Sequence, residues 1–224
     1  ELFLARPSDI NMRVVNCTTA AQYFHILRRQ AALLRRDPLP LIVLTPKSLL
    51  RHPLVASTPM ELAQGRFRSV IDDQEARQRA SSVRRLVLCS GKVYVDLVSS
   101  DRRQSATQVA VCRVEQLAPF PRIALREVLD SYQSLEEVAW LQEEPENMGA
   151  WDWVRGQLEE TVEDRASIRF IGRVRSASPS EGSAAWHQIN QRKLVDEAFG
   201  FDSNAIAGST ILSKSVRSLT GSKR

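Results

Sequence analysis

From residue 83 to residue 200 the chain alternates short apolar runs with segments of helical periodicity, and this alternation restricts the fold more than any other feature. Strands separated by single helices of this length form βαβ units, in which neighbouring strands run parallel. Right-handed crossovers then place helices on both faces of the sheet. The sequence therefore predicts a three-layer α/β domain with a mostly parallel sheet. The expected strands are 85–89, 108–114, 138–142 and 168–171, and the expected helices are 92–100, 123–131, 150–160 and 183–199.

The first 54 residues contain the end of a second α/β unit. Apolar runs at 12–17 and 39–44 are typical of short strands. Between them apolar residues recur at helical spacing over 19–36, which predicts an amphipathic helix. Pro38 ends this helix, because the residue before a proline avoids the helical conformation.

Two further segments divide the chain. Residues 55–82 are polar and contain turn signals, which predicts a connector, and the charged run at 72–85 is expected to be solvated. The last residues are rich in Ser, Thr, Gly and basic residues without periodicity, which predicts a disordered basic tail. The predicted boundaries are 1–54, 55–82, 83–200 and 201–224.

Charge, hydropathy and cysteine content exclude several classes of function. The net charge is +5, but the predicted tail carries most of it, so the body lacks the basic face that nucleic-acid binding requires. No apolar run reaches the roughly 18–20 residues that span a bilayer, so no membrane segment is expected. Cys17, Cys89 and Cys112 lie far apart, which indicates reduced core thiols rather than disulfides or a metal site.

The least repetitive stretch is Gln-Glu-Glu-Pro-Glu-Asn-Met-Gly-Ala-Trp at 142–151. It joins an expected strand to an expected helix, so it is typical of a strand end, a tight turn and a helix start. Adjacent carboxylates at Glu143 and Glu144 can act as an acid–base pair, but we favour capping of the helix and its dipole. The residues assigned to this turn or to an interface are Glu143, Glu144, Asn147, Gly149 and Trp151.

Several basic residues lie near the ends of expected elements. Together they could bind a phosphorylated effector, or they could simply be solvated or paired with carboxylates. No nucleophile elbow of the form G-x-S-x-G is present, so we predict no catalytic residue in this chain, and we predict no metal ligand. The candidate effector-binding residues are Lys47, Arg51, Lys92 and Arg155. His52, which follows Arg51, belongs to the same basic group.

Six segments, taken in order, resemble the thiamine diphosphate-dependent 2-oxoglutarate dehydrogenases. Two of them are similar to the end of that family's pyrimidine-binding domain and four to its C-terminal domain. The resemblance covers most of residues 1–200, and the Glu-Glu-Pro-Glu-Asn-Met-Gly-Ala-Trp string is its most specific motif. The matching segments are 12–30 and 45–53 for the first domain, and 88–97, 113–121, 142–151 and 172–183 for the second.

The resemblance implies a transketolase C-terminal-like fold preceded by the end of a pyrimidine-binding domain. It also implies that the complete enzyme is an oxidoreductase of the tricarboxylic acid cycle, which decarboxylates 2-oxoglutarate and passes the succinyl group to a lipoyl-bearing succinyltransferase. Thiamine diphosphate and Mg²⁺ would be held by upstream domains, so this chain alone is expected to be inactive. The implied setting is a homodimer in a multienzyme complex, in the bacterial cytoplasm or the mitochondrial matrix.

For this segment the resemblance implies dimerisation, bracing of the upstream domains and binding of a nucleotide or acyl-coenzyme A effector. It further predicts sheet edges at 12–17 and 41–44 that upstream strands would cover. Glu181 departs from the family pattern, where a small residue or threonine is expected. Two alternatives stay open: the same region of a 2-oxoadipate dehydrogenase, and a freestanding, non-catalytic α/β interaction module.

Overall fold

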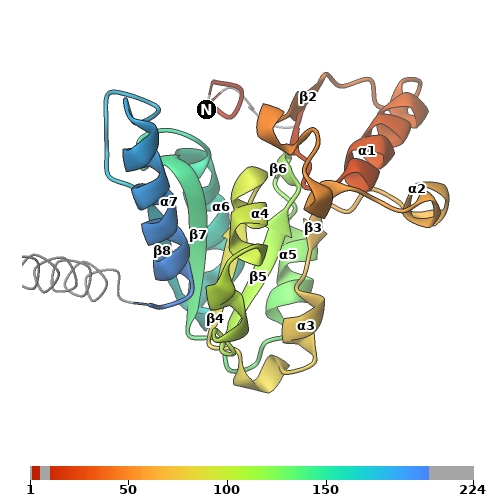
Figure 1. The fold of residues 1–224 in the computed structure, drawn as a ribbon. Coiled ribbons are helices and arrows are strands. Elements are labelled where there is room, and N and C mark those ends of the chain that lie inside the picture. Colours follow the sequence, from red (N-terminus) through yellow and green to blue (C-terminus); the bar gives the residue numbers. More distant parts are fainter. Residues whose placement is uncertain (1, 6–10, 202–224) are drawn as a thin grey trace, which may run out of the picture.

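Two β-sheets organise the chain in a computed structural model that describes residues 2–5 and 11–201 (Figure 1). The larger sheet forms the body of the molecule, and the smaller sheet lies at the upper right of Figure 1. From residue 202 onward the predicted basic tail lies outside the described residues.

The larger sheet has five strands. They are β3 (Val70–Ile71), β4 (Arg85–Cys89), β5 (Val109–Val114), β7 (Glu137–Pro145) and β8 (Ser167–Arg173). Their order is β3-β5-β4-β7-β8. Four of the strands are parallel, and the short edge strand β3 is antiparallel to β5. The sheet is therefore mostly parallel, as the βαβ pattern predicts.

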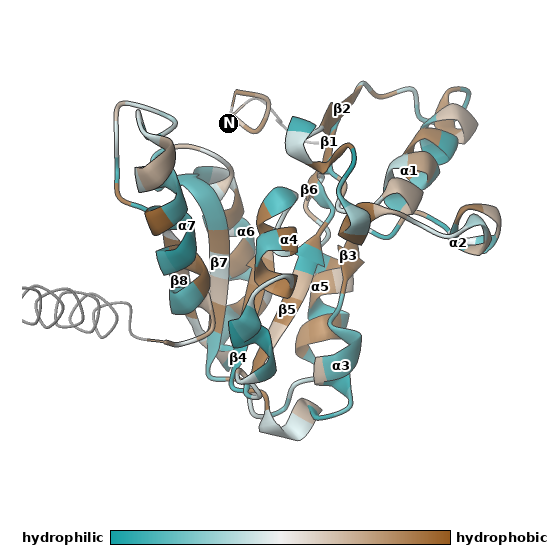
Figure 2. Ribbon diagram, in the orientation of Figure 1, coloured by the Kyte–Doolittle hydropathy of each residue, from teal (hydrophilic) through white to brown (hydrophobic). Residues whose placement is uncertain are grey.

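Helices cover both faces of the larger sheet. They are α4 (Lys92–Val98), α5 (Arg122–Leu129), α6 (Trp151–Val162) and α7 (Ala184–Ala198). Side chains alternate along β4: Leu86 and Leu88 pack with the buried faces of α5 and α6, whereas Val87 and Cys89 pack with α4 and α7. In Figure 2 apolar residues follow β5, and hydrophilic residues cover much of α7. The predicted three-layer α/β domain is confirmed.

The smaller sheet combines strands from two of the predicted segments, residues 1–54 and residues 83–200. Its strands are β1 (Arg13–Asn16), β2 (Leu41–Leu44) and β6 (Gln116–Ala118), and α1 (Ala20–Leu33) connects the first two. The order is β2-β1-β6, with β1 parallel to β2 and antiparallel to β6. Both edges of β1 are thus paired, so the prediction of an open edge at 12–17 is wrong. Strand β6, which follows the larger sheet in the chain, occupies that edge.

The predicted connector contains more regular structure than its polar sequence indicates. It holds α2 (Pro59–Gln64), β3 and α3 (Gln74–Arg77). Asp73 caps α3, is 6% exposed, and accepts hydrogen bonds from Arg103 (2.6 Å) and the Val111 amide (2.9 Å). The expectation of a solvated run is therefore wrong at Asp73, whereas the boundary at residue 82 stays a prediction. Short 3-10 helices lie at Lys47–Leu49, Pro53–Val55, Ala80–Ser82, Asp101–Gln104 and Glu163–Arg165.

Candidate functional site

The carboxyl ends of β4 and β7 lie side by side where the larger sheet changes direction. From β4 the chain runs through α4 to β5, and from β7 it runs through α6 to β8, on the other side of the strand pair. Because the two crossovers diverge, they leave a crevice between the strand ends, and α/β sheets bind ligands at such points. This edge of the sheet is therefore the candidate functional site.

A hollow of about 130 Å³ lies at this point, between the two sheets. The larger sheet lines it with Ser90, Lys92 and Glu144, and the smaller sheet closes it with Asn16 and Leu44. Ser90 Oγ and Asn16 Oδ1 are buried and have no hydrogen-bond partner within the described part of the chain. The hollow is therefore polar and large enough for water or a small polar molecule.

Gly91 brings the two sheets into contact beside the hollow. Its φ angle is 67°, in the left-handed region that favours glycine. A Cβ atom at this position would lie 2.2 Å from Asn16 Nδ2. The turn after β4 can therefore meet the smaller sheet only because residue 91 has no side chain.

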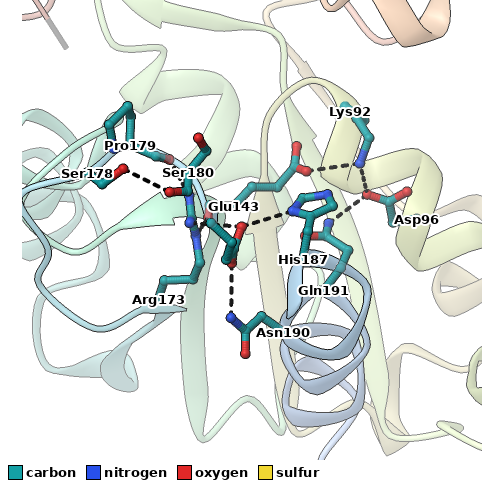
Figure 3. A network of polar contacts seen from close by, with 11 residues as sticks. Lys92, Asp96, Glu143, Arg173, Ser178, Pro179, Ser180, His187, Asn190 and Gln191 are labelled. Carbon is teal, nitrogen blue, oxygen red and sulfur yellow. Dashed lines mark hydrogen bonds and ion pairs between the residues drawn. The ribbon is translucent and has the colours of Figure 1, made fainter. Parts of the chain in front are cut away.

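Lys92 connects three elements at this edge (Figure 3). Its Nζ donates to Asp96 Oδ2 at 2.6 Å and to Glu143 Oε1 at 2.9 Å, and Gln191 of α7 donates to Asp96 Oδ2 at 2.7 Å. Partial burial by itself lowers the pKa of Lys92, but the hydrogen bonds to Asp96 and Glu143 outweigh it and the pKa is raised. Lys92 is thus a cation whose charge two carboxylates neutralise.

Glu181 organises the loop between β8 and α7, and Figure 3 shows its partners Arg173, His187 and Asn190. It accepts hydrogen bonds from Asn190 Nδ2 (3.0 Å) and pairs with Arg173 (3.1 Å) and His187 (3.1 Å). The Asn190 hydrogen bond, with the contacts from His187 and Arg173, lowers the pKa of Glu181 to about 2. Glu181, where the resemblance predicted a small residue or threonine, therefore holds this loop against the start of α7.

Gln142 caps α6, a role that the sequence analysis assigned to the neighbouring carboxylates. Its Oε1 accepts from the amides of Ala150 (3.2 Å) and Trp151 (3.0 Å) and from the Trp140 indole (3.0 Å). Its Nε2 donates to the carbonyls of the turn, at Glu144, Pro145 and Met148. The capping interpretation of Glu143 and Glu144 is wrong, because a neutral amide both donates and accepts at this buried point.

The other residues of the string build the turn and join it to its surroundings. Asn147 exchanges two hydrogen bonds with the backbone of Ser176, at 2.9 and 3.0 Å. Gly149 has a φ of 69°, and a Cβ there would lie 2.8 Å from Gln142 Nε2. Trp151 is buried against Phe170, whereas the Trp153 indole donates to the Leu117 carbonyl at 2.7 Å. The second tryptophan thus ties α6 to the smaller sheet.

The structure does not gather the basic effector candidates around the hollow. Lys92 lines it, but Lys47, Arg51 and Arg155 are not among its lining residues. Lys47 and Arg51 are exposed beyond β2, and Arg155 pairs with Glu159 on the exposed face of α6. Effector binding by these four residues stays a prediction.

The described residues include no group of three or more His, Cys, Asp or Glu side chains arranged to hold a metal ion. Within residues 2–5 and 11–201, therefore, no carboxylate cluster offers the oxygen ligands that Mg²⁺ requires. Among these residues no helix is long and apolar enough to cross a membrane. Cys89 and Cys112 are fully buried free thiols.

Sequence reasoning missed several residues of the site. Gln142, Asp96 and Gln191 carry its hydrogen bonds, but none belongs to a motif with a known chemical role. One signal was available: Lys92 and Asp96 stand four apart on one helix, which is the spacing of a surface ion pair. The others depend on contacts between distant segments.

A three-layer α/β domain with a mostly parallel five-stranded sheet fits the transketolase C-terminal-like class. Residues 56–199 match the family model described as 2-oxoglutarate dehydrogenase C-terminal, and the chain belongs to this family. The resemblance that the sequence motifs indicate is therefore confirmed.

Relatives from three bacteria extend the match beyond this domain. The chain is 41% identical over 201 residues to the 2-oxoglutarate dehydrogenase E1 component of Shouchella clausii, which is 88% of this chain and 21% of that protein. It is 42% identical over 197 residues to the E1 component of a Geobacillus species and 38% over 205 residues to that of an Exiguobacterium species. These alignments cover 87% and 90% of this chain. The chain thus spans about a fifth of the length of the curated relatives it matches.

Proposed function

We propose that this chain is the C-terminal part of a thiamine diphosphate-dependent 2-oxoglutarate dehydrogenase. The complete enzyme would oxidatively decarboxylate 2-oxoglutarate in the tricarboxylic acid cycle and transfer the succinyl group to a lipoyl-bearing succinyltransferase. The observation that supports this proposal is the 41% identity over 88% of the chain to a named E1 component. The cofactor would supply the carbanion chemistry from upstream domains, in the bacterial cytoplasm or the mitochondrial matrix.

The role proposed for this segment is to brace the upstream domains and to support a homodimer. The support comes from the apolar surface of the smaller sheet and its helix. Tyr23, Phe24 and Leu27 on α1 are between 41% and 45% exposed, and Leu50 beyond β2 is 77% exposed. Strand β2 also has no partner at its outer edge among the described strands. Such a surface is suited to packing against another domain or subunit.

An effector role would depend on Lys92. Its ammonium group already pairs with Asp96 and Glu143, so a phosphorylated effector would have to displace a carboxylate in order to bind. The hollow beside it is also small for a nucleotide, so such an effector would have to extend beyond it. A binding test with AMP and with acetyl-coenzyme A, on wild type and on Lys92→Met, examines this role. Equal affinity in the two proteins would remove Lys92 from any effector site.

The decisive experiment is an activity assay on the whole native polypeptide that contains this chain. With thiamine diphosphate, Mg²⁺ and ferricyanide as electron acceptor, we expect reduction of ferricyanide that depends on 2-oxoglutarate. Turnover with 2-oxoadipate alone would instead assign the chain to that paralogue. A native mass near 25.2 kDa together with no turnover on either acid would support the freestanding interaction module.

A further inference from the structure

Glu115 is the single residue between β5 and β6, where the chain leaves the larger sheet and enters the smaller one. Its side chain is fully buried. Its backbone N–H donates to the Ser69 carbonyl at 2.9 Å, and its carbonyl accepts from the Asn16 amide at 2.9 Å. Three segments that are distant in the sequence therefore meet at one residue.

The Glu115 carboxyl group holds the segment that starts α1. Oε2 accepts from the Thr18 amide at 2.9 Å, and Oε1 accepts from the Thr18 hydroxyl, Oγ1. Thr18 is 1% exposed, and the next residue, Thr19, caps α1 by accepting from the Gln22 amide. A change at Glu115 is therefore passed directly to the position of α1.

Only one cation in the described part of the chain supports a charge on Glu115, and it does so indirectly. Arg113 of β5 donates to Thr18 Oγ1 at 2.9 Å and lies 4.5 Å above the Tyr94 ring of α4. Arg29 of α1 donates to Gln116 at 2.6 Å instead. A fully buried carboxylate without a direct counter-ion is costly, so its ionised form gains by exposure to water.

The other titratable groups that face Glu115 stay neutral near pH 7. Burial raises the pKa of the Cys17 thiol to about 12, and it raises the pKa of the Cys89 thiol on β4 still further. Tyr94, which lies against Arg113 rather than Glu115, also has a raised pKa, again because of burial. None of these groups changes its charge between pH 5 and pH 8, so Glu115 is the member of the cluster that titrates there.

We propose that Glu115, Thr18 and Arg113 form a proton-operated joint between the two sheets. The joint is closed while Glu115 carries a proton, and it loosens when that proton is lost. The closed geometry suits the neutral group because the carboxyl group is fully buried and has no direct counter-ion, although the Thr18 amide and hydroxyl both donate to it. Loosening would release the start of α1 and with it the apolar surface of the smaller sheet.

The direction of the pH effect follows from the two states of the carboxyl group. Burial raises the pKa of Glu115 to about 7, and the hydrogen bonds from Thr18 and the charge of Arg113 offset only part of this shift. In the open joint the hydrated group keeps its usual pKa of 4.5. The equilibrium constant for opening is therefore smallest below that pH. It rises about tenfold per pH unit above it and levels off above pH 7.

Hydrogen exchange on the whole native polypeptide tests the joint. The measurement is deuterium uptake in peptides covering residues 17–26, between pH 5 and pH 8.5, corrected for the intrinsic pH dependence of amide exchange. Opening should increase by more than tenfold between pH 5 and pH 7 and then become constant. Peptides of β4, in the same samples, should keep constant protection. Uptake at residues 17–26 that does not change over this range would overturn the proposal.

Three variants separate the joint from general pH effects. Glu115→Gln mimics the neutral group, so residues 17–26 should stay protected at every pH. Arg113→Gln removes the supporting cation, so opening should level off at a higher pH; this variant keeps the test decisive if Glu115→Gln does not fold. Glu136→Gln removes an exposed carboxylate elsewhere and should behave as wild type. An unchanged pH dependence in both joint variants contradicts the proposal.

Discussion

The two sheets of this chain begin from the same unit, a strand, a helix and a parallel strand, but they bury very different amounts of apolar surface. In the larger sheet Leu86, Val87 and Leu88 of β4 are completely buried, because helices cover both faces. In the smaller sheet every residue of β2 is at least partly exposed, and α1 turns aromatic side chains to the surface. The local sequence pattern of a strand–helix–strand unit therefore does not decide whether the unit buries its own apolar surface.

The difference indicates how stability is distributed. The larger sheet draws most of its stability from contacts among residues 83–200, and Val14, Val70 and Ala76 add to the same core. The smaller sheet depends on β6 and on the contact of Trp153 with Leu117, both of which belong to the other region of the chain. We expect the smaller sheet to be the less stable part and the first to open.

The largest expected effect compares one leucine from each sheet. Leu88→Ala should lower the free energy of unfolding by about 2–5 kcal/mol, because it leaves a cavity in a fully buried core. Leu44→Ala should cost less than about 1 kcal/mol, because that side chain is 36% exposed. Urea denaturation of the chain measures both values. Equal losses would show that the smaller sheet is as tightly packed as the larger one.

A second prediction concerns the polar centre of the larger domain. Gln142→Leu should lower the free energy of unfolding by about 2–4 kcal/mol, because it leaves the amides of Ala150 and Trp151 buried without acceptors. Gln191→Leu is the matched control, since this partly exposed residue donates only to Asp96 and should cost less than about 1 kcal/mol. Similar losses in the two variants would contradict the role assigned to Gln142.

A third prediction concerns Glu115, at the connection between the two sheets, and the pH dependence of the free energy of unfolding. The pKa of Glu115 is about 7 in the folded chain and near 4.5 when unfolded. Its contribution to stability is therefore complete below pH 4.5 and is lost as pH rises through 7. Relative to Glu115→Gln, the wild-type free energy of unfolding should fall by up to about 3 kcal/mol over this interval. Parallel curves for the two proteins would refute the assignment.

The smallest effect on stability accompanies a clear effect on association. Leu50→Ser should change the free energy of unfolding by no more than about 0.5 kcal/mol, since the side chain is 77% exposed. It should nevertheless reduce self-association of the chain, measured by sedimentation velocity, because exposed apolar side chains around the smaller sheet promote association. Ile123→Ser on α5, which is 79% exposed in the larger domain, should not change association.

Much of the larger domain could be predicted from local patterns. The strand at Arg85–Cys89 matches its predicted bounds, and the other predicted strands and helices are present with shifted ends. The extension of β7 to Pro145 was missed, because the polar residues of the string do not resemble a strand. Strand β3 was missed for a related reason: two residues in a polar segment carry no periodicity, and only pairing with β5 defines them.

The candidate site was less predictable than the fold. The string at 142–151 was correctly placed at a strand end and a helix start, but its capping residue is Gln142 rather than Glu143 or Glu144. Neighbouring residues with similar hydrogen-bonding capacity compete for such a role, and the direction of each side chain decides between them. Strand geometry turns Gln142 inward toward α6 and Glu143 toward Lys92.

By itself, the sequence determined the order of elements, the two-face burial of the larger sheet and membership of the family, because these follow from periodicity and from motifs in a fixed order. Only the tertiary structure decided that β6 completes the smaller sheet, that Gly91 meets Asn16, and that Glu115 is buried at the joint. Each of these facts is a contact between residues far apart in the chain. Such contacts depend on how the two sheets pack, and no local pattern encodes that arrangement.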